Sequence, residues 1–467
     1  MKKLIAISVV FALVAGAAFA ADVSGEVIGA TDIIKGSTAK STYSDGSDKP
    51  NDVGAGGFPG GLKRLRLHAS GENDDGTFGG WLRIEKYGPG KVGYDDGKPV
   101  SLYDNVYLGG YAWWKPVEQV KFRLGENADG DFDANGVTGW GFYQVAGDVG
   151  VPKESWGYSS SFFGGWSKNG GLLTLTPAEG LEINLGIPYS DGGKAQYVYM
   201  SSTLQIAYTA EGLGKFALTY KGGKGNNKRL KDKSAAGVET FEYDHDPGQL
   251  WVFAGLTMIE NLEIDVGLGY KLPASGEGVE FNFPFDIVDT DGDGEPDSGK
   301  ATGKGTIQEP IAFGLGAHYN GGDFGVKART QVKLAGKYTI TAVEAGGTYV
   351  DFDPAVPSYK IPMNIKFDVL PYYNINESLS FLFSAGVDYT AKSSNEGDKE
   401  VDYAKTGFHV TPYITIKSSW WAPNFYAGID IRTDGTKKEK VNGKYVESKN
   451  GGTTTNWSVP LGIVFAF

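Results

Sequence analysis

The sequence predicts an all-β protein, namely a single closed antiparallel transmembrane β-barrel of roughly 18 strands, within limits of about 16 to 20. Three observations lead to this prediction. Apolar and polar residues alternate with period two along much of the chain, and short and long connections alternate between these segments. After the N-terminal stretch, no apolar run approaches the ~20 residues that a membrane helix needs.

The first 20 residues are a predicted signal peptide. Lys2 and Lys3 form a basic start, Leu4–Val14 is an apolar core, and Ala18–Ala20 fits a cleavage site flanked by small residues. The apolar core is too short for a membrane helix and ends in small residues. We therefore expect an exported protein in which residues 21–467 form one barrel domain.

Composition narrows the function classes further. The formal net charge is -12, and an acidic exported chain is a poor partner for nucleic acid. The absence of cysteine excludes a disulfide framework, a thiol nucleophile and a thiolate metal site. With 70 glycines and 26 tyrosines, the composition favours strands and tight turns over helices.

Individual segments show strands with one apolar and one polar face. In KRLRLHA, Leu65 and Leu67 alternate with Arg64 and Arg66. The segments FGGWLRIE, VKFRLG and DFGVKARTQVKL repeat this pattern. In a membrane barrel the apolar face meets lipid and the polar face lines the lumen.

The connections between strands are of two kinds. Short turns such as ENDDG, EGLG and NGGD alternate with longer polar segments, which lie near 35–60, 88–102, 127–157, 190–197, 223–247, 272–305, 336–360, 390–403 and 434–453. We interpret them as short periplasmic turns and long external loops, one of which, 127–157, would fold inward and narrow the pore. Residues 137–148 are either a further strand or part of that loop.

The C-terminal segment NWSVPLGIVFAF has the pattern of a strand that closes the sheet. Apolar residues occupy every second position up to Phe465 and Phe467. We expect this strand to pair with the first strand near Val23–Ile34. Pro460 interrupts the pattern, because proline lacks the N–H that a ladder needs. A bulge at this position and a different strand register are the two alternatives.

The predicted signal peptide, the alternating strands and the terminal aromatic residue together resemble Gram-negative outer-membrane porins. The general arrangement is also similar to spirochaete porin-like surface proteins. The resemblance covers most of the chain and implies an outer-membrane location, contact with outer-membrane lipid and folding by the barrel-assembly machinery; it leaves a homo-oligomer open. The assembly signal that it implies comprises Trp457, Leu461, Ile463, Phe465 and Phe467.

The polar faces of the strands supply the candidate pore-lining residues. These are Arg64, Arg66, Trp81, Arg83, Tyr107, Tyr111, Lys121, Arg123, Glu182, Glu263, Asp265, Lys327, Arg329 and Lys333. Basic rows facing an acidic row across a narrow pore would create a transverse field that orients polar solutes. The simpler alternative is ordinary lumen lining with salt bridges between strands.

One acidic segment, DTDGDGEPD, is a candidate calcium loop. Asp289, Asp291 and Asp293 occupy alternate positions, and Asp297 follows. Oxygen ligands in a glycine-containing loop suit Ca²⁺. Lys300 stands where an EF-hand has glutamate, so the full EF-hand pattern is absent. A calcium site of the short acidic-repeat type and a solvated acidic loop both remain open.

The predicted function is a porin, a passive channel for small hydrophilic solutes and ions through a charged, water-filled lumen. The alternative is a surface barrel without a channel, acting as an adhesin or receptor with calcium-ordered external loops. An enzyme is not expected, and no catalytic residue is assigned. The four histidines are scattered without metal-ligand spacing, and no G-x-S-x-G or P-loop motif is present.

Overall fold

The structure is a computed structural model that describes residues 20–37, 54–55, 62–87, 94–95, 98–99, 106–125, 170–188, 202–222, 228–229, 238–242, 248–282, 300–308, 311–345, 348–351, 358–361, 363–391, 405–417, 424–434, 438–441, 444–447 and 454–466. The regular elements of these residues are all β-strands, as predicted. Within the described ranges, no helix is long and apolar enough to cross a membrane.

The strands, in chain order, are β1 (Ala20–Ser37), β2 (Gly54–Ala55), β3 (Leu62–Glu72), β4 (Phe78–Tyr87), β5 (Tyr94–Asp95), β6 (Lys98–Pro99), β7 (Val106–Val117), β8 (Val120–Gly125), β9 (Gly170–Ala178), β10 (Leu181–Pro188), β11 (Thr203–Ala210), β12 (Gly214–Lys221), β13 (Lys228–Arg229), β14 (Val238–Glu242), β15 (Gln249–Ile259), β16 (Leu262–Lys271), β17 (Ala274–Asn282), β18 (Lys300–Gln308), β19 (Ala312–Asn320), β20 (Phe324–Lys333), β21 (Gly336–Ala345), β22 (Thr348–Asp351), β23 (Ser358–Ile361), β24 (Asn364–Asn374), β25 (Leu379–Thr390), β26 (Lys405–Lys417), β27 (Asn424–Gly428), β28 (Asp430–Asp434), β29 (Lys438–Val441), β30 (Lys444–Glu447) and β31 (Thr454–Ala466). Among the described residues they form a 20-stranded main sheet, a 7-stranded sheet and two 2-stranded sheets.

The main sheet is antiparallel, and its neighbours follow chain order. Pairing passes from β1 through β3, β4, β7, β8, β9, β10, β11, β12, β15, β16, β19, β20, β24, β25 and β26 to β27 and β28, and then to β31. Strand β31 also pairs with β1. Since β27 and β28 share one position and β2 adds two residues beside β1, the sheet has about 18 strand positions.

The register around Pro460 explains how the last strand accommodates a proline. On one side, the pairing of β31 with β1 shifts next to Asp32, which is the partner of Pro460. On the other side, β27 pairs with β31 as far as Leu461, and β28 resumes at Ser458. Both neighbouring ladders are therefore irregular where the N–H is missing. Of the two alternatives for Pro460, the bulge is the one present.

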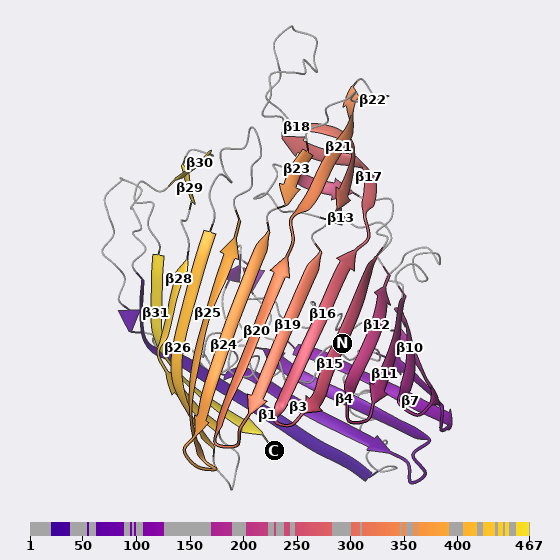
Figure 1. The fold of residues 1–467 in the computed structure, drawn as a ribbon, viewed down its shortest axis with the longest axis vertical. Coiled ribbons are helices and arrows are strands. Elements are labelled where there is room, and N and C mark those ends of the chain that lie inside the picture. The colour runs from indigo at the N-terminus through magenta and orange to yellow at the C-terminus, as the bar shows by residue number, and fades with distance from the viewer. Residues whose placement is uncertain are drawn as a thin grey trace.

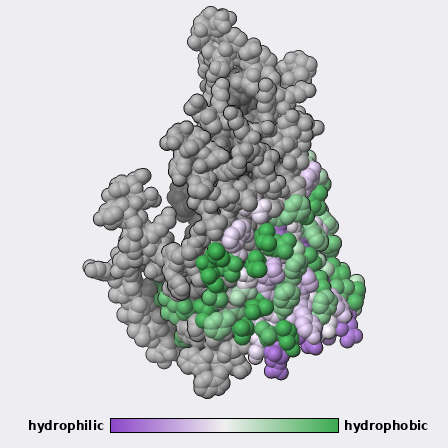
Figure 2. Space-filling view, turned by 90° about the vertical axis from the view of Figure 1, so that its left-hand side faces the viewer, coloured by the Kyte–Doolittle hydropathy of each residue, from purple (hydrophilic) through white to green (hydrophobic). Residues whose placement is uncertain are grey.

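The two faces of the main sheet differ in polarity and exposure. On β11 the buried face carries Thr203, Gln205 and Ala207, which are 0%, 1% and 2% exposed. The opposite face carries Leu204, Ile206 and Tyr208, which are 41%, 41% and 49% exposed. Figure 2 shows apolar residues over the outer surface of the described wall, with hydrophilic residues at its lower edge. Polar residues thus face inward and apolar residues outward, the reverse of a water-soluble domain.

The predicted short turns lie at the lower end of the main sheet in Figure 1. In the turn between β3 and β4, Thr77 donates its hydroxyl and its backbone N–H to the Asp75 carboxylate, at 2.6 and 3.1 Å. These hydrogen bonds hold the pKa of the Asp75 carboxyl below its usual value. The side-chain oxygen of Asn73 accepts the N–H of Phe78 at 2.7 Å, which fixes the start of β4.

The turn between β11 and β12 needs glycine at one position. Gly214 has φ 142°, and a Cβ there would lie 2.0 Å from the backbone oxygen of Gly255. Gly212, two residues earlier, has φ 70° and open space around its Cβ position. We expect Gly214→Ala to lower the free energy of unfolding by at least about 2 kcal/mol, because strain and a backbone clash add. For Gly212→Ala we expect about 1 kcal/mol. Urea unfolding of the protein in detergent compares the two, and equal losses would contradict the assignment.

A second sheet stands beyond the end of the main sheet opposite the short turns (Figure 1). It contains β13, β14, β17, β18, β21, β22 and β23. These strands fall largely in segments 223–247, 272–305 and 336–360, which the sequence indicated only as long polar connections. That interpretation was incomplete, because β17 and β18 are rich in glycine and lack a clean apolar face, yet their backbones still pair.

Candidate functional site

The interior face of the main sheet, defined as its less exposed face, carries the candidate pore-lining residues. Cross-strand partners share a face, so the register places them together. Those with described side chains are Arg66, Trp81, Arg83, Tyr111, Lys121, Arg123, Glu182, Glu263, Asp265, Lys327, Arg329 and Lys333. Arg64 and Tyr107 belong to β3 and β7, but their side chains lie outside the described set.

Four cations lie on the interior side of β3, β4 and β8, and with Glu85 we call them the basic arc. Glu85 is fully buried. Its carboxylate accepts a hydrogen bond from Arg66 at 2.8 Å and forms an ion pair with Arg83 at 2.5 Å. The other two cations of the arc are Lys121 and Arg123. Sequence reasoning did not single out Glu85, although it shares the polar face of FGGWLRIE.

Aromatic rings lie among the cations of the basic arc. Trp81 and Tyr111 stack with centroids 5.5 Å apart and planes at 29°. The Arg123 guanidinium lies 5.4 Å from the centre of the Tyr111 ring, and the Lys121 ammonium lies 4.6 Å from that of Trp113. Each pair is close enough for a cation–π attraction. The predicted grouping of basic and aromatic residues on one face is therefore present.

A second cluster lies on β20, β24 and β26 and is fully enclosed. Arg329 Nη2 is 3.1 Å from Asp368 Oδ2, and His409 Nε2 is 3.4 Å from Asp368 Oδ1. The side chains are 4%, 0% and 6% exposed for Arg329, Asp368 and His409. We call these three residues the Asp368 cluster. A charge buried to this extent needs its partner, since it has lost its hydration.

Ser384 adds to this cluster without forming a catalytic relay. Its hydroxyl lies 3.3 Å from His409 Nε2, the same nitrogen that lies near Asp368. A serine–histidine–aspartate triad uses one imidazole nitrogen for the serine and the other for the aspartate. The arrangement therefore lacks the geometry that would activate the serine.

The predicted acidic and second basic rows lie side by side. Glu263 Oε2 is 3.1 Å from His318 Nδ1, and Lys327 is the cross-strand partner of His318. Nε2 of His318 is also 3.1 Å from the hydroxyl of Tyr372. Only β19 separates β16 from β20, so the acidic row of β16 and the second basic row of β20 are near neighbours in the sheet.

One interior region is apolar, which the sequence did not predict. Trp251 and Phe253 are 8% and 5% exposed and belong to a buried cluster with Ala207, Ala217 and Ala312. A Cβ on Gly269 would lie 2.7 Å from the Trp251 ring, so this glycine gives the ring its place. In QLWVFAG both faces carry large apolar residues, and alternation alone could not indicate which face is interior.

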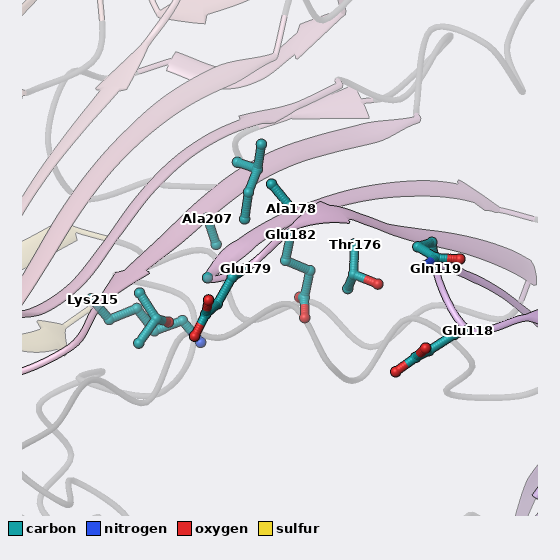
Figure 3. A pocket seen from close by; sticks show the side chains of 11 residues that line it. Glu118, Gln119, Thr176, Ala178, Glu179, Glu182, Ala207 and Lys215 are labelled. Atoms are coloured by element: carbon teal, nitrogen blue, oxygen red, sulfur yellow. The ribbon is translucent and has the colours of Figure 1, made fainter.

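A hollow of about 420 Å³ lies at the short-turn end of β8, β9, β10, β11 and β12. Figure 3 shows Glu118, Glu179, Glu182 and Lys215 around it. Glu182 accepts a hydrogen bond from the Asn184 amide, which orients its carboxylate. The lining is mostly polar, unlike the apolar pockets that enclose small ligands, so the hollow suits hydrated solutes.

The other predicted sites are only partly described. Asp289, Asp291, Asp293 and Asp297 lie outside the described residues. Within the described part of the chain, no group of three or more histidine, aspartate or glutamate side chains could hold a metal ion. Among the residues of the assembly signal, Leu461 is exposed, and Trp457 and Ile463 are half-buried. Phe465 is described only by its backbone, which pairs with Val27, and Phe467 lies outside the described residues.

Comparison with models of known protein families and with curated proteins gave no match. Three solved structures resemble the chain weakly. OmpT of Vibrio cholerae, expressed in the outer membrane, is 11% identical, with a TM-score of 0.40 over 96% of this chain and 97% of that one. OmpF of Salmonella typhi in complex with daunomycin is 13% identical, with a TM-score of 0.39 over 96% and 97%. A structure described as a porin is 12% identical, with a TM-score of 0.33 over 96% and 100%. Values of this size assign neither a family nor a function.

Proposed function

We propose that the protein is a closed β-barrel of the bacterial outer membrane and acts as a porin for small hydrophilic solutes and ions. The observation that carries the proposal is the reversed polarity of the main sheet. Exposed leucine, isoleucine and aromatic side chains cover its outer face, and charged side chains cover its interior face. The ladder that returns from β31 to β1 supports closure.

Two physical requirements of a membrane location, paired backbone groups and an apolar outer surface, support this proposal. In hydrocarbon every backbone N–H and C=O needs a partner within the protein, which a sheet provides only when its last strand pairs with its first. An exposed apolar face of this extent is unfavourable in water and favourable against lipid. The short turns would then face the periplasm, and the second sheet would stand outside the cell.

In this proposal transport is passive. A closed sheet of about 18 strands leaves an aqueous channel once its interior side chains are in place. Solutes enter through the polar openings of the channel, and the pore selects them by size and by the field of the interior charges. Outer-membrane lipid and the barrel-assembly machinery are the partners that this function requires. We assign no catalytic role, in keeping with the Nε2 geometry at His409.

Channel formation is a direct prediction. The refolded full-length protein, added at nanomolar concentration to a planar lipid bilayer in potassium chloride, is expected to give discrete conductance steps, because the interior charges keep water and ions in the lumen. The heat-unfolded protein in the same detergent is the control. Many insertions of folded protein without any step would overturn the porin proposal.

A second candidate function follows from the second sheet. Its seven strands extend beyond the main sheet and would present a large ordered surface outside the cell, as an adhesin or receptor needs. Calcium bound by Asp289, Asp291, Asp293 and Asp297, in the connection between β17 and β18, would order this surface. Calcium titration of the wild type against an Asp291→Ala, Asp293→Ala variant tests the site. Equal binding by both proteins would remove it.

A further inference from the structure

The interior charge is unevenly distributed among the strands. The basic arc has four cations, two of which share the single carboxylate of Glu85. The register also places Glu26 and Asp22 of β1 and Glu72 of β3 on this face. With Arg64 of β3 counted beside the four cations of the arc, cations exceed carboxylates by one.

Along β16 to β26, by contrast, opposite charges are matched. Arg329 pairs with Asp368, and Lys366 Nζ lies 3.3 Å from Asp388 Oδ2. The interior side of β3, β4 and β8 therefore carries a small excess of positive charge.

Three of the four cations of the basic arc are accessible, and the fourth, Arg123, is only 9% exposed. Arg66 and Arg83 are 20% and 23% exposed, and Lys121 is half-buried. Arg329 is 4% exposed and has its salt bridge to Asp368. A solute that moves along the lumen can approach the charges of the arc, whereas the Asp368 cluster is closed to it.

Aromatic rings on β3, β4 and β7 lie beside these charges. His68 lies edge-on to Trp81 at 5.4 Å, and Trp81 stacks on Tyr111. Trp113 continues the series on the same face of β7, with Lys121 against its ring. The rings are held by one another and by cations, so a solute that binds them loses little free energy to ordering the site.

We propose that the basic arc, with Trp81, Tyr111 and Trp113, is a binding track for anionic solutes that have a planar aromatic ring, such as aromatic carboxylates. The carboxylate would accept hydrogen bonds from an arginine or lysine, and the ring would pack against the tryptophans and the tyrosine. This inference rests on the proposed channel function and names its solute class. An inorganic anion would use only the charges, and an uncharged sugar only the rings.

The chain offers a matched pair of residues for the test. Trp113 and Trp114 are consecutive on β7 and therefore point to opposite faces. Trp113 belongs to the interior track, whereas Trp114 is 47% exposed on the outer face, where it stacks on Phe122 at 5.8 Å. Trp113→Ala removes a ring from the track, and Trp114→Ala removes the same ring from the lipid side.

The experiment uses the full-length protein in planar bilayers with a potassium chloride gradient. The reversal potential is expected to show a preference for chloride, and benzoate is expected to inhibit the chloride current at lower concentration than acetate does. Trp113→Ala is expected to weaken benzoate inhibition about three- to tenfold, which corresponds to the loss of one aromatic contact. Trp113→Phe should retain most of the inhibition and Trp114→Ala all of it, while Arg83→Gln should lower the chloride preference.

The outcomes separate this inference from the function on which it rests. Absence of conductance would overturn both. A conducting channel that prefers potassium, or that benzoate and acetate inhibit equally, would overturn only the track. Equal effects of Trp113→Ala and Trp114→Ala would also overturn it, because the interior position would then have no special role. If Trp113→Ala fails to fold, Trp113→Phe and Arg83→Gln decide alone.

Discussion

Deletion of residues 454–467 is expected to abolish folding of the main sheet. Strand β31 pairs with β1 on one side and with β27 and β28 on the other, so its loss leaves two unpaired edges. In the proposed membrane location, each unpaired backbone group would cost several kcal/mol, which exceeds the stability of ordinary proteins when summed along a strand. The measurement is the heat-dependent shift in electrophoretic mobility that folded barrels show after refolding in detergent.

The control for this deletion is removal of a peripheral hairpin. Strands β29 and β30 pair only with each other among the described residues. Replacing residues 436–449 with a short glycine–serine linker should therefore leave the mobility shift and the urea midpoint nearly unchanged. Folding of the chain without β31 would show that β1 does not need this partner.

Replacing Asp368 with alanine is expected to be the most destabilising single substitution among the interior charges. The change removes the carboxylate that lies beside Arg329 and His409 and leaves a guanidinium in an enclosed site. Breaking a buried ion pair in this way costs about 3–5 kcal/mol in the free energy of unfolding. Urea unfolding followed by tryptophan fluorescence would measure the loss.

Asp388 provides the matched comparison. It pairs with Lys366 on the same interior face but is 36% exposed, so water compensates for much of the lost contact. Asp388→Ala should cost less than about 1 kcal/mol. The double variant Arg329→Met, Asp368→Leu should recover much of the stability lost in Asp368→Ala, since it removes both buried charges. A double variant no more stable than Asp368→Ala would mean that packing, rather than the unpaired cation, sets the cost.

Alternation in the sequence sufficed to predict the strands and their polar faces. Arg66, Arg83, Lys121 and Arg123 could be assigned to one face because each alternates with an apolar neighbour. The irregularity at Pro460 could also be anticipated, since a missing N–H is a property of the residue alone. The break between β27 and β28 opposite it could not, because it depends on which strand becomes the neighbour.

The features that sequence reasoning missed depend on strand neighbours or on a second type of sheet. Asp368 alternates like any other residue of the polar face. Only the pairing of β24 with β20, and of β25 with both β24 and β26, brings Arg329 and His409 to it. Trp251 gave no sign of its burial, because its place depends on Gly269 across the ladder. Strands β17 and β18 pair through their backbones with little apolar pattern, which a search for amphipathic strands overlooks.

The joints between the two sheets have a mechanical consequence. Two residues separate β16 from β17, β20 from β21, and β23 from β24, and three separate β18 from β19. Four such joints, far shorter than flexible linkers, leave the second sheet little freedom to swing as a tethered unit. A force applied to the second sheet would be transmitted through several strands at once to the main sheet. The second sheet would therefore move with the main sheet as one rigid unit.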